Sequence, residues 1–151
     1  MFGKLQLRVL GAVTVLILAG CGGGTVSETP PDEALREQIH AATGHEPQSC
    51  VDYRSRDALI LITDQSITEC VIVNPSSNLT IRNQGTSPAT FVASDPGGNM
   101  VVRHVRIEAD LGPGDEYVIS PTSELVGDGV YPYWVRGSQP EGKTGSLVVR
   151  S

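Results

Sequence analysis

The sequence has little positive charge, few aromatic residues and no long apolar run. Lys and Arg number 11 against 17 Asp and Glu, which gives a net charge of −6, and 5% of the residues are aromatic. This acidic balance argues against binding to nucleic acid or to anionic lipid through basic residues. The apolar run Val9–Ala19 is too short for a comfortable transmembrane helix. Cysteine is scarce too, and the three cysteines include no C-x-x-C redox motif.

Turn-forming residues, in contrast, are abundant. The chain contains 17 Gly and 10 Pro, and 39% of its residues are hydrophobic. This composition favours a strand-rich globular domain with many turns over a disordered chain. A chain of 151 residues is long enough for one domain. About 100 residues remain for its core after the segments at the front are set aside.

The first residues have the pattern of a bacterial lipoprotein signal. Lys4 and Arg8 precede the apolar run Val9–Ala19, which leads into Leu-Ala-Gly-Cys ending at Cys21. In such a lipobox the chain is cleaved before the cysteine, which receives acyl chains such as palmitate and anchors the protein. We therefore predict a protein lipid-anchored in the cell membrane or outer membrane and facing outside the cytoplasm. An uncleaved membrane helix is the alternative. Loss of Lys4 and Arg8 would lower the net charge from −6 to −8.

The rest of the chain divides by composition. A stretch rich in Gly, Ser, Thr and Pro follows Cys21, and an apolar stripe of helical period comes next. Thr29 and Asp32 have the spacing of a capping box, and Gly44 suits the end of the helix. We predict four segments: a signal peptide at 1–20, a lipidated tether at 21–31, a short helix and linker at 32–49, and a β domain at 50–151.

Cys50 and Cys70 are the only cysteines left once Cys21 carries lipid. In an exported protein two remaining thiols most simply form a disulfide. A free pair available to a metal or to redox chemistry is the alternative. The disulfide would close a loop of about 20 residues before the second predicted strand.

Short apolar runs separated by turns predict seven or eight strands. No helical period occurs among these runs, so an all-β Greek-key sandwich is expected. The clearest runs are Ala58–Thr63, Val71–Val73, Leu79–Arg82, Phe91–Ala93 and Tyr117–Ile119, and a closing pair follows after Gly129.

The segment from Gly129 to Arg136 predicts a half-buried strand. Tyr131, Tyr133 and Val135 share one side, which we expect to face the core. Trp134, the only tryptophan, then lies on the outward side. It is either exposed and available for a protein contact, or covered by the segment 46–56 or by the helix.

Gly129–Val149 resembles the C-terminal signature of the cupredoxins, the small blue copper proteins, which reads G-x-Y-x-[FY]-x-C-x-x-H-x-x-x-x-M-x-G-x-[VIL]-x-V. The framework positions that match are Gly129, Tyr131, Tyr133, Gly145, Leu147 and Val149. Upstream, the segment after Asn83 is similar to the family's N-x-G-x-P-H-x-x-F pattern, and 111–117 is similar to its L-x-P-G-[DE]-x-[YF] turn. The resemblance implies a cupredoxin-like β-sandwich over roughly the last two-thirds of the chain.

The resemblance also implies where copper ligands would stand, and none of the four is kept. Ala89 replaces the first His, Val135 the Cys, Ser138 the second His and Lys143 the axial Met. A blue copper site needs a thiolate and two imidazoles. Valine has no lone pair and a lysine ammonium repels a cation, so we predict that the protein carries no cofactor.

The function predicted from these observations is that of a non-catalytic binding module. Its partner would be an unidentified envelope protein or a small ligand. The predicted surface is the end of the sandwich that carries Pro88, Ala89, Ser138, Pro140 and Lys143, with Trp134 possible as a further contact.

Two other functions are weighed against this one. The first is copper handling or electron transfer through ligands outside the family pattern, namely His40, His45 and His104. The second is a hydrolase that uses Ser138 and Lys143. A Ser-Lys pair needs a desolvated lysine and an oxyanion hole, whereas Glu141 nearby favours a charged Lys143. We therefore predict that the protein is not an enzyme.

Overall fold

The computed structural model describes residues 26–95, 105–120, 122, 127–137 and 144–151. Within these ranges the chain forms strands and one helix. In chain order they are β1 (Ser27–Thr29), α1 (Glu33–Thr43), β2 (Cys50–Asp52), β3 (Ala58–Ile62), β4 (Cys70–Val73), β5 (Leu79–Asn83), β6 (Ala89–Ser94), β7 (Val105–Leu111), β8 (Glu116–Ile119), β9 (Gly129–Arg136) and β10 (Thr144–Val149).

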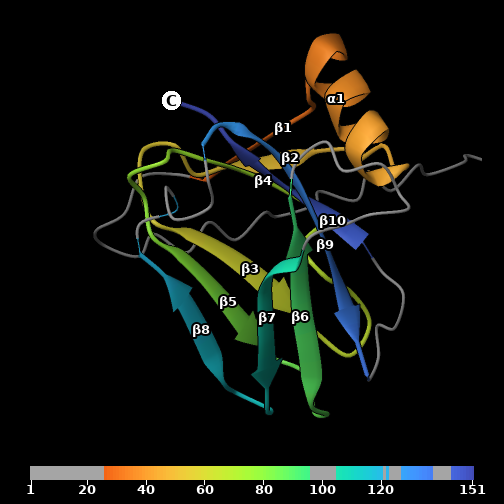
Figure 1. Cartoon of the computed structure of the whole chain (residues 1–151), viewed down its shortest axis with the longest axis vertical. Helices are drawn as coiled ribbons and strands as arrows, with labels where there is room; N and C mark the ends of the chain where they lie inside the picture. The colour runs from red at the N-terminus through yellow and green to blue at the C-terminus, as the bar shows by residue number, and fades with distance from the viewer. Residues whose placement is uncertain (1–25, 96–104, 121, 123–126, 138–143) are drawn as a thin grey trace, which may run out of the picture.

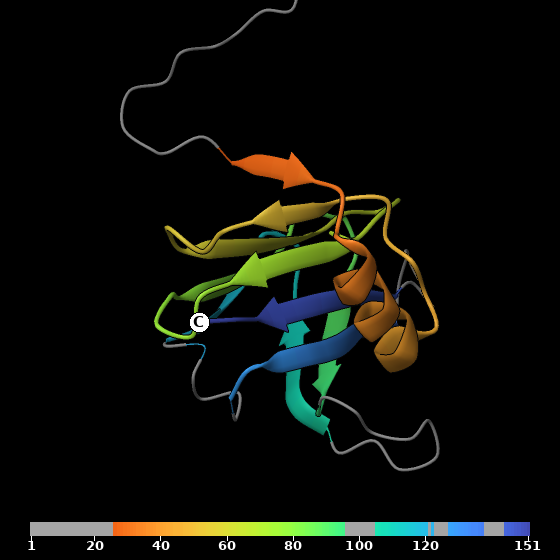
Figure 2. The ribbon, with the colours of Figure 1, turned by 90° about the horizontal axis from the view of Figure 1, so that it is seen from above.

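The strands form two sheets that pack face to face as a sandwich (Figures 1 and 2). The larger sheet has the order β1-β2-β4-β10-β9-β6-β7, and the smaller one has the order β3-β5-β8. After β7 the chain crosses to the smaller sheet for β8 and returns as β9, beside β6 on the side away from β7. This return is a Greek-key connection. The predicted all-β sandwich with a preceding helix is therefore confirmed.

The core lies between the two sheets and follows the alternation of the strands. Tyr131, Tyr133 and Val135 of β9 are buried in the main hydrophobic cluster, as the sequence predicted. The rings of Phe91 and Tyr133 lie 5.2 Å apart between centroids, at an angle of 38°. Tyr131 also donates a hydrogen bond of 2.8 Å from its hydroxyl to the carbonyl oxygen of Gly127, which fixes the entry into β9.

Helix α1 packs on the outer face of the larger sheet and forms a second, smaller core there. Leu35 and Ile39 are buried against Val130 of β9 and Val148 of β10, together with the Cys50–Cys70 pair. The helix begins after Asp32, whose carboxylate accepts a hydrogen bond of 2.7 Å from the Leu35 N–H. The predicted end at Gly44 is confirmed, since Gly44 has a φ of 69° and donates to the His40 carbonyl.

The predicted capping role of Thr29 is wrong, because Thr29 belongs to strand β1. This strand lies within the segment predicted as a tether. It pairs with β2 along three residues, from Ser27 opposite Asp52 to Thr29 opposite Cys50. Strands β1 and β2 raise the number above the seven or eight predicted. Among the described residues, no helix has the length and apolarity needed to cross a membrane.

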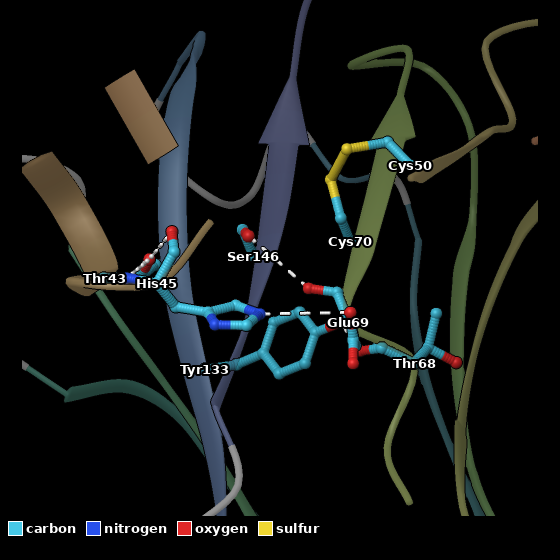
Figure 3. The surroundings of a disulfide bond; sticks show 8 residues. All are labelled: Thr43, His45, Cys50, Thr68, Glu69, Cys70, Tyr133 and Ser146. Carbon is cyan, nitrogen blue, oxygen red and sulfur yellow. Dashed lines mark hydrogen bonds and ion pairs between the residues drawn. A yellow bond between two sulfur atoms is a disulfide. The ribbon is translucent and has the colours of Figure 1, made fainter. Parts of the chain in front are cut away.

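The predicted disulfide between Cys50 and Cys70 is confirmed (Figure 3). It joins the neighbouring strands β2 and β4, and both cysteines are at most 1% exposed. Next to it, the Tyr133 hydroxyl donates to the Thr68 carbonyl and the Ser146 N–H donates to the Glu69 carbonyl, the latter at 2.9 Å. Burial raises the pKa of Tyr133 well above its usual range, so this hydroxyl stays protonated. These two hydrogen bonds tie β9 and β10 to the segment that leads into β4.

Candidate functional site

The structure brings Ala89 and Val135, two of the four inferred ligand positions, to the same end of the sandwich. Ala89 begins β6 and Val135 lies near the end of β9. The two strands are antiparallel neighbours with Phe91 opposite Val135 and Thr90 opposite Arg136. Ser138 and Lys143 lie outside the described residues.

Neither described position can hold a metal ion. Ala89 is 4% exposed and Val135 is 1% exposed, and both belong to the main hydrophobic cluster. Their side chains carry only carbon, which cannot donate an electron pair to copper. The chemistry of these two positions therefore does not fit a blue copper centre, and no step of any mechanism is assigned to copper.

A shallow depression of about 260 Å³ lies at this end of the sandwich. It forms where β6 begins and where β7 and β9 end. Its lining consists of Pro88, Ala89, Thr90, Asp110, Leu111, Gly112, Arg136 and Gly137. Polar contacts order the rim, since the Thr90 hydroxyl lies 2.6 Å from an Asp110 carboxylate oxygen and Arg136 lies 3.4 Å from Glu108. The depression thus offers a small apolar floor with a charged rim.

The residues predicted to form the binding surface differ in whether their side chains are exposed at this depression. Pro88 is exposed, as predicted. The prediction that Ala89 presents its side chain on the surface is wrong, because its methyl group is packed into the core. Ser138, Pro140 and Lys143 lie outside the described residues. The exposed guanidinium of Arg136 is a contact that the sequence analysis missed.

Trp134 lies on the outer side of β9 and is half-buried. It sits opposite Val92 of β6 on one side and Thr144 of β10 on the other. Helix α1 covers Val130, at the start of the same strand. Trp134 is therefore neither fully exposed nor fully buried, and its position lies between the exposed and the covered arrangement that the sequence allowed.

The buried side chain of Asn83 holds the loops at this end together. Asn83 ends β5, and its side-chain amide donates to the carbonyl oxygens of Ser87 at 2.9 Å and Leu111 at 3.0 Å. Its side-chain oxygen accepts the Gly85 N–H at 2.9 Å. One residue therefore joins the loop before β6 to the end of β7, and all the hydrogen-bonding groups of its side chain are used except one lone pair.

Two carboxylates extend this network over the neighbouring loops. Asp64 accepts hydrogen bonds from the backbone N–H and the hydroxyl of Thr86, at 2.7 and 3.0 Å. Asp115 accepts the Gly112 N–H at 2.8 Å and donates its own N–H to the Gly112 carbonyl at 3.0 Å. The loop before β6 and the turn after β7 are thus held by side-chain hydrogen bonds, which lowers the entropy cost of ordering these two segments when a partner binds.

Two of the three histidines of the alternative function, His40 and His45, lie among the described residues, and each contacts a different glutamate. His40 lies 3.6 Å from Glu46, and His45 lies 3.9 Å from Glu69. These are separate exposed pairs, and His104 lies outside the described residues. In the part of the chain that the structure describes, no group of three or more His, Cys, Asp or Glu side chains is placed to hold a metal ion.

Neither a protein family nor a curated protein matches the sequence. Solved structures similar to this one include cupredoxins. A reduced auracyanin from Roseiflexus castenholzii is 15% identical over 64% of this chain and 98% of its own, with a TM-score of 0.47. A purple cupredoxin from Nitrosopumilus maritimus is 18% identical over 62% and 100%, with a TM-score of 0.46. Reduced rusticyanin is 13% identical over 83% and 100%, with a TM-score of 0.46. These three matches have identities of 13% to 18%, and no role of this chain is drawn from them.

Proposed function

We propose that this protein is a lipid-anchored envelope protein, facing outside the cytoplasm, whose cupredoxin-like domain is a non-catalytic binding module without copper. The lipobox at Cys21 supports the anchor. The disulfide between Cys50 and Cys70 supports an oxidising compartment. The working surface is the end of the sandwich around Pro88 and Arg136, with Ser138, Pro140 and Lys143 of the following loop.

The observation that carries the proposal is the apolar character of Ala89 and Val135. These positions would supply a His and a Cys in a copper protein, yet here both side chains belong to the hydrophobic core. Asn83 and Asp64 hold the loop before β6 and the end of β7 in place. Segments that are already held in place suit recognition, because binding then requires little further ordering of them.

Full-length protein in detergent is expected to bind no stoichiometric copper, to show no visible absorption band and to melt at an unchanged temperature after exposure to Cu(I) or Cu(II). The reason is the missing thiolate and imidazoles. An auracyanin treated in parallel serves as the positive control for loading. Stoichiometric copper with a raised melting temperature, lost in His40→Ala, His45→Ala or His104→Ala variants, would instead establish the copper-handling alternative.

A photo-crosslinking amino acid in place of Pro88 is expected to give a discrete adduct in intact cells, located in the membrane fraction. The same amino acid in place of Ser76, in the exposed turn between β4 and β5, is the matched control and should give none. A Cys21→Ser variant should no longer be recovered as mature protein in the membrane fraction. Equal adducts from both positions, or none from Pro88, would refute the proposed surface.

A further inference from the structure

A groove lies at the edge of the sandwich where the smaller sheet ends, between its edge strand β3 and strands β1 and β2 of the larger sheet. The larger sheet continues past β4 into β2 and β1, whereas the smaller sheet ends at β3 (Figure 1). The inner face of β1 and β2 is therefore not covered by a facing strand. The groove measures about 380 Å³, and its walls include Val26, Glu28, Val51, Tyr53, Leu59 and Glu69.

Strand β3 presents unused backbone groups to this groove. In its parallel pairing with β5, the even-numbered residues make the ladder bonds, as shown by Ala58 donating to Asn78 and Ile62 accepting from Gln84. The odd-numbered residues therefore direct their N–H and C=O groups to the free edge. Those of Leu61 are satisfied by Thr68, at 2.9 and 3.0 Å. Those of Leu59 have no partner among the residues that the structure describes.

The side chains around this edge combine an apolar floor with acidic walls. Val51 and Tyr53 are partly buried and pack against the main core, and Leu59 is half-buried beside them. Glu28 lies opposite Val51 in the pairing of β1 with β2, so it faces the same side. Glu69 lines the groove as well, and its contact with His45 at 3.9 Å is exposed and weak.

We propose that this groove binds an extended peptide of a partner protein, which adds as a strand along β3. The peptide backbone pairs with Leu59, its apolar side chains lie against Val51 and Tyr53, and a basic side chain lies near Glu28 or Glu69. A partner segment with basic residues complements these carboxylates and the acidic chain as a whole. A second copy of the chain would bring like charges together. This site lies apart from the depression of the proposed function.

The test uses a phage-displayed library of random octapeptides selected against the full-length protein in detergent. Enriched peptides are expected to combine alternating apolar residues with Lys or Arg. On addition of a synthetic enriched peptide, hydrogen exchange of the Leu59 amide should slow at least tenfold. The Ile60 amide, which already belongs to the ladder, should not change. The double variant Glu28→Gln, Glu69→Gln should lower the affinity about tenfold, whereas Glu46→Gln, an acidic residue near the helix, should not.

Three results would overturn the proposal. The first is a library that yields no enriched peptide with basic residues. The second is an enriched peptide that binds without slowing exchange at Leu59, which would place it elsewhere. The third is protection of Leu59 by concentration-dependent dimerisation without any peptide, which would make a second copy the occupant. Circular dichroism of the Gln variants checks that a loss of affinity does not reflect unfolding. None of these results bears on adducts formed from Pro88.

Discussion

An Asn83→Ala variant is expected to lose roughly 4 kcal/mol of unfolding free energy, because two buried backbone groups and one partly buried group lose their partners at once. These groups are the carbonyl oxygens of Ser87 and Leu111 and the N–H of Gly85. An unsatisfied buried group costs about 1 to 3 kcal/mol, and water will reach some of the released groups. Urea unfolding followed by the fluorescence of Trp134, the only tryptophan, measures the loss.

The matched control is Asn74→Ala, in the turn at the opposite end of the sandwich. Among the described residues, the hydrogen bonds of the Asn74 side chain go to Ser76 alone, in an exposed turn, so its loss should cost less than about 1 kcal/mol. Hydrogen exchange separates a local from a global effect. The Gly85 amide should exchange faster in Asn83→Ala, whereas the Thr86 amide, held by Asp64, should change less. Equal losses in the two variants would show that the Asn83 network is not the support we describe.

The fold could be predicted from the sequence where a residue pattern is compatible with only one local structure. Alternation in β9 required Tyr131, Tyr133 and Val135 to share a buried face, and the structure confirms this. The Cys50–Cys70 disulfide was predicted because these are the two cysteines that remain in an exported protein once Cys21 is set aside for lipid, and the structure confirms the pairing. Strand β1 was not predictable in this way, because Ser27–Thr29 is three residues long, exposed and polar. Only its pairing with β2 makes it a strand.

The candidate site was less predictable, because its features depend on contacts between distant segments. The sequence located the end of the sandwich near Pro88, but it did not show that Ala89 is packed under the surface. The sequence placed Asn83 at the end of a strand but did not reveal the role of its side chain, because one hydrogen-bond partner, Leu111, lies 28 residues away. The sequence shows only an asparagine at the end of a predicted strand with a glycine two residues later, and this pattern does not reveal that the side chain is buried or which groups it binds.

The groove beside β3 had no signal in the sequence at all. Its apolar residues come from β2, β3, β4, the segment after β2 and Val26 just before β1, so no single stretch of sequence carries the pattern. What makes it a groove is that the two sheets differ in width, so that β1 and β2 have no strand facing them. Sequence periodicity identifies the faces of strands but not the edges at which a sheet stops.

A Gly145→Ala variant is expected to lose about 3 kcal/mol of unfolding free energy, at the upper end of what overpacking typically costs. A Cβ atom at position 145 would lie 2.6 Å from the Tyr133 hydroxyl oxygen and closer still to two carbons of its ring. The ring has no room to retreat, because Tyr133 is fully buried and its hydroxyl is bonded to Thr68. Gly145 is thus the place where β10 passes directly over a core aromatic ring, which gives a physical reason for a glycine in the framework.

The clash with Tyr133 can be isolated by a double-mutant cycle. Tyr133→Leu alone should destabilise the protein by leaving a cavity, but it also removes the atoms that a methyl group at position 145 would meet. The Gly145→Ala, Tyr133→Leu pair should therefore lose less than the sum of the two single variants, by more than about 1 kcal/mol. Thr144→Ala, at the half-buried neighbouring position in β10, controls for a side-chain change in this strand. Additive losses, or a Gly145→Ala variant as stable as Thr144→Ala, would mean that the contact between β10 and the Tyr133 ring is not what requires glycine at this position.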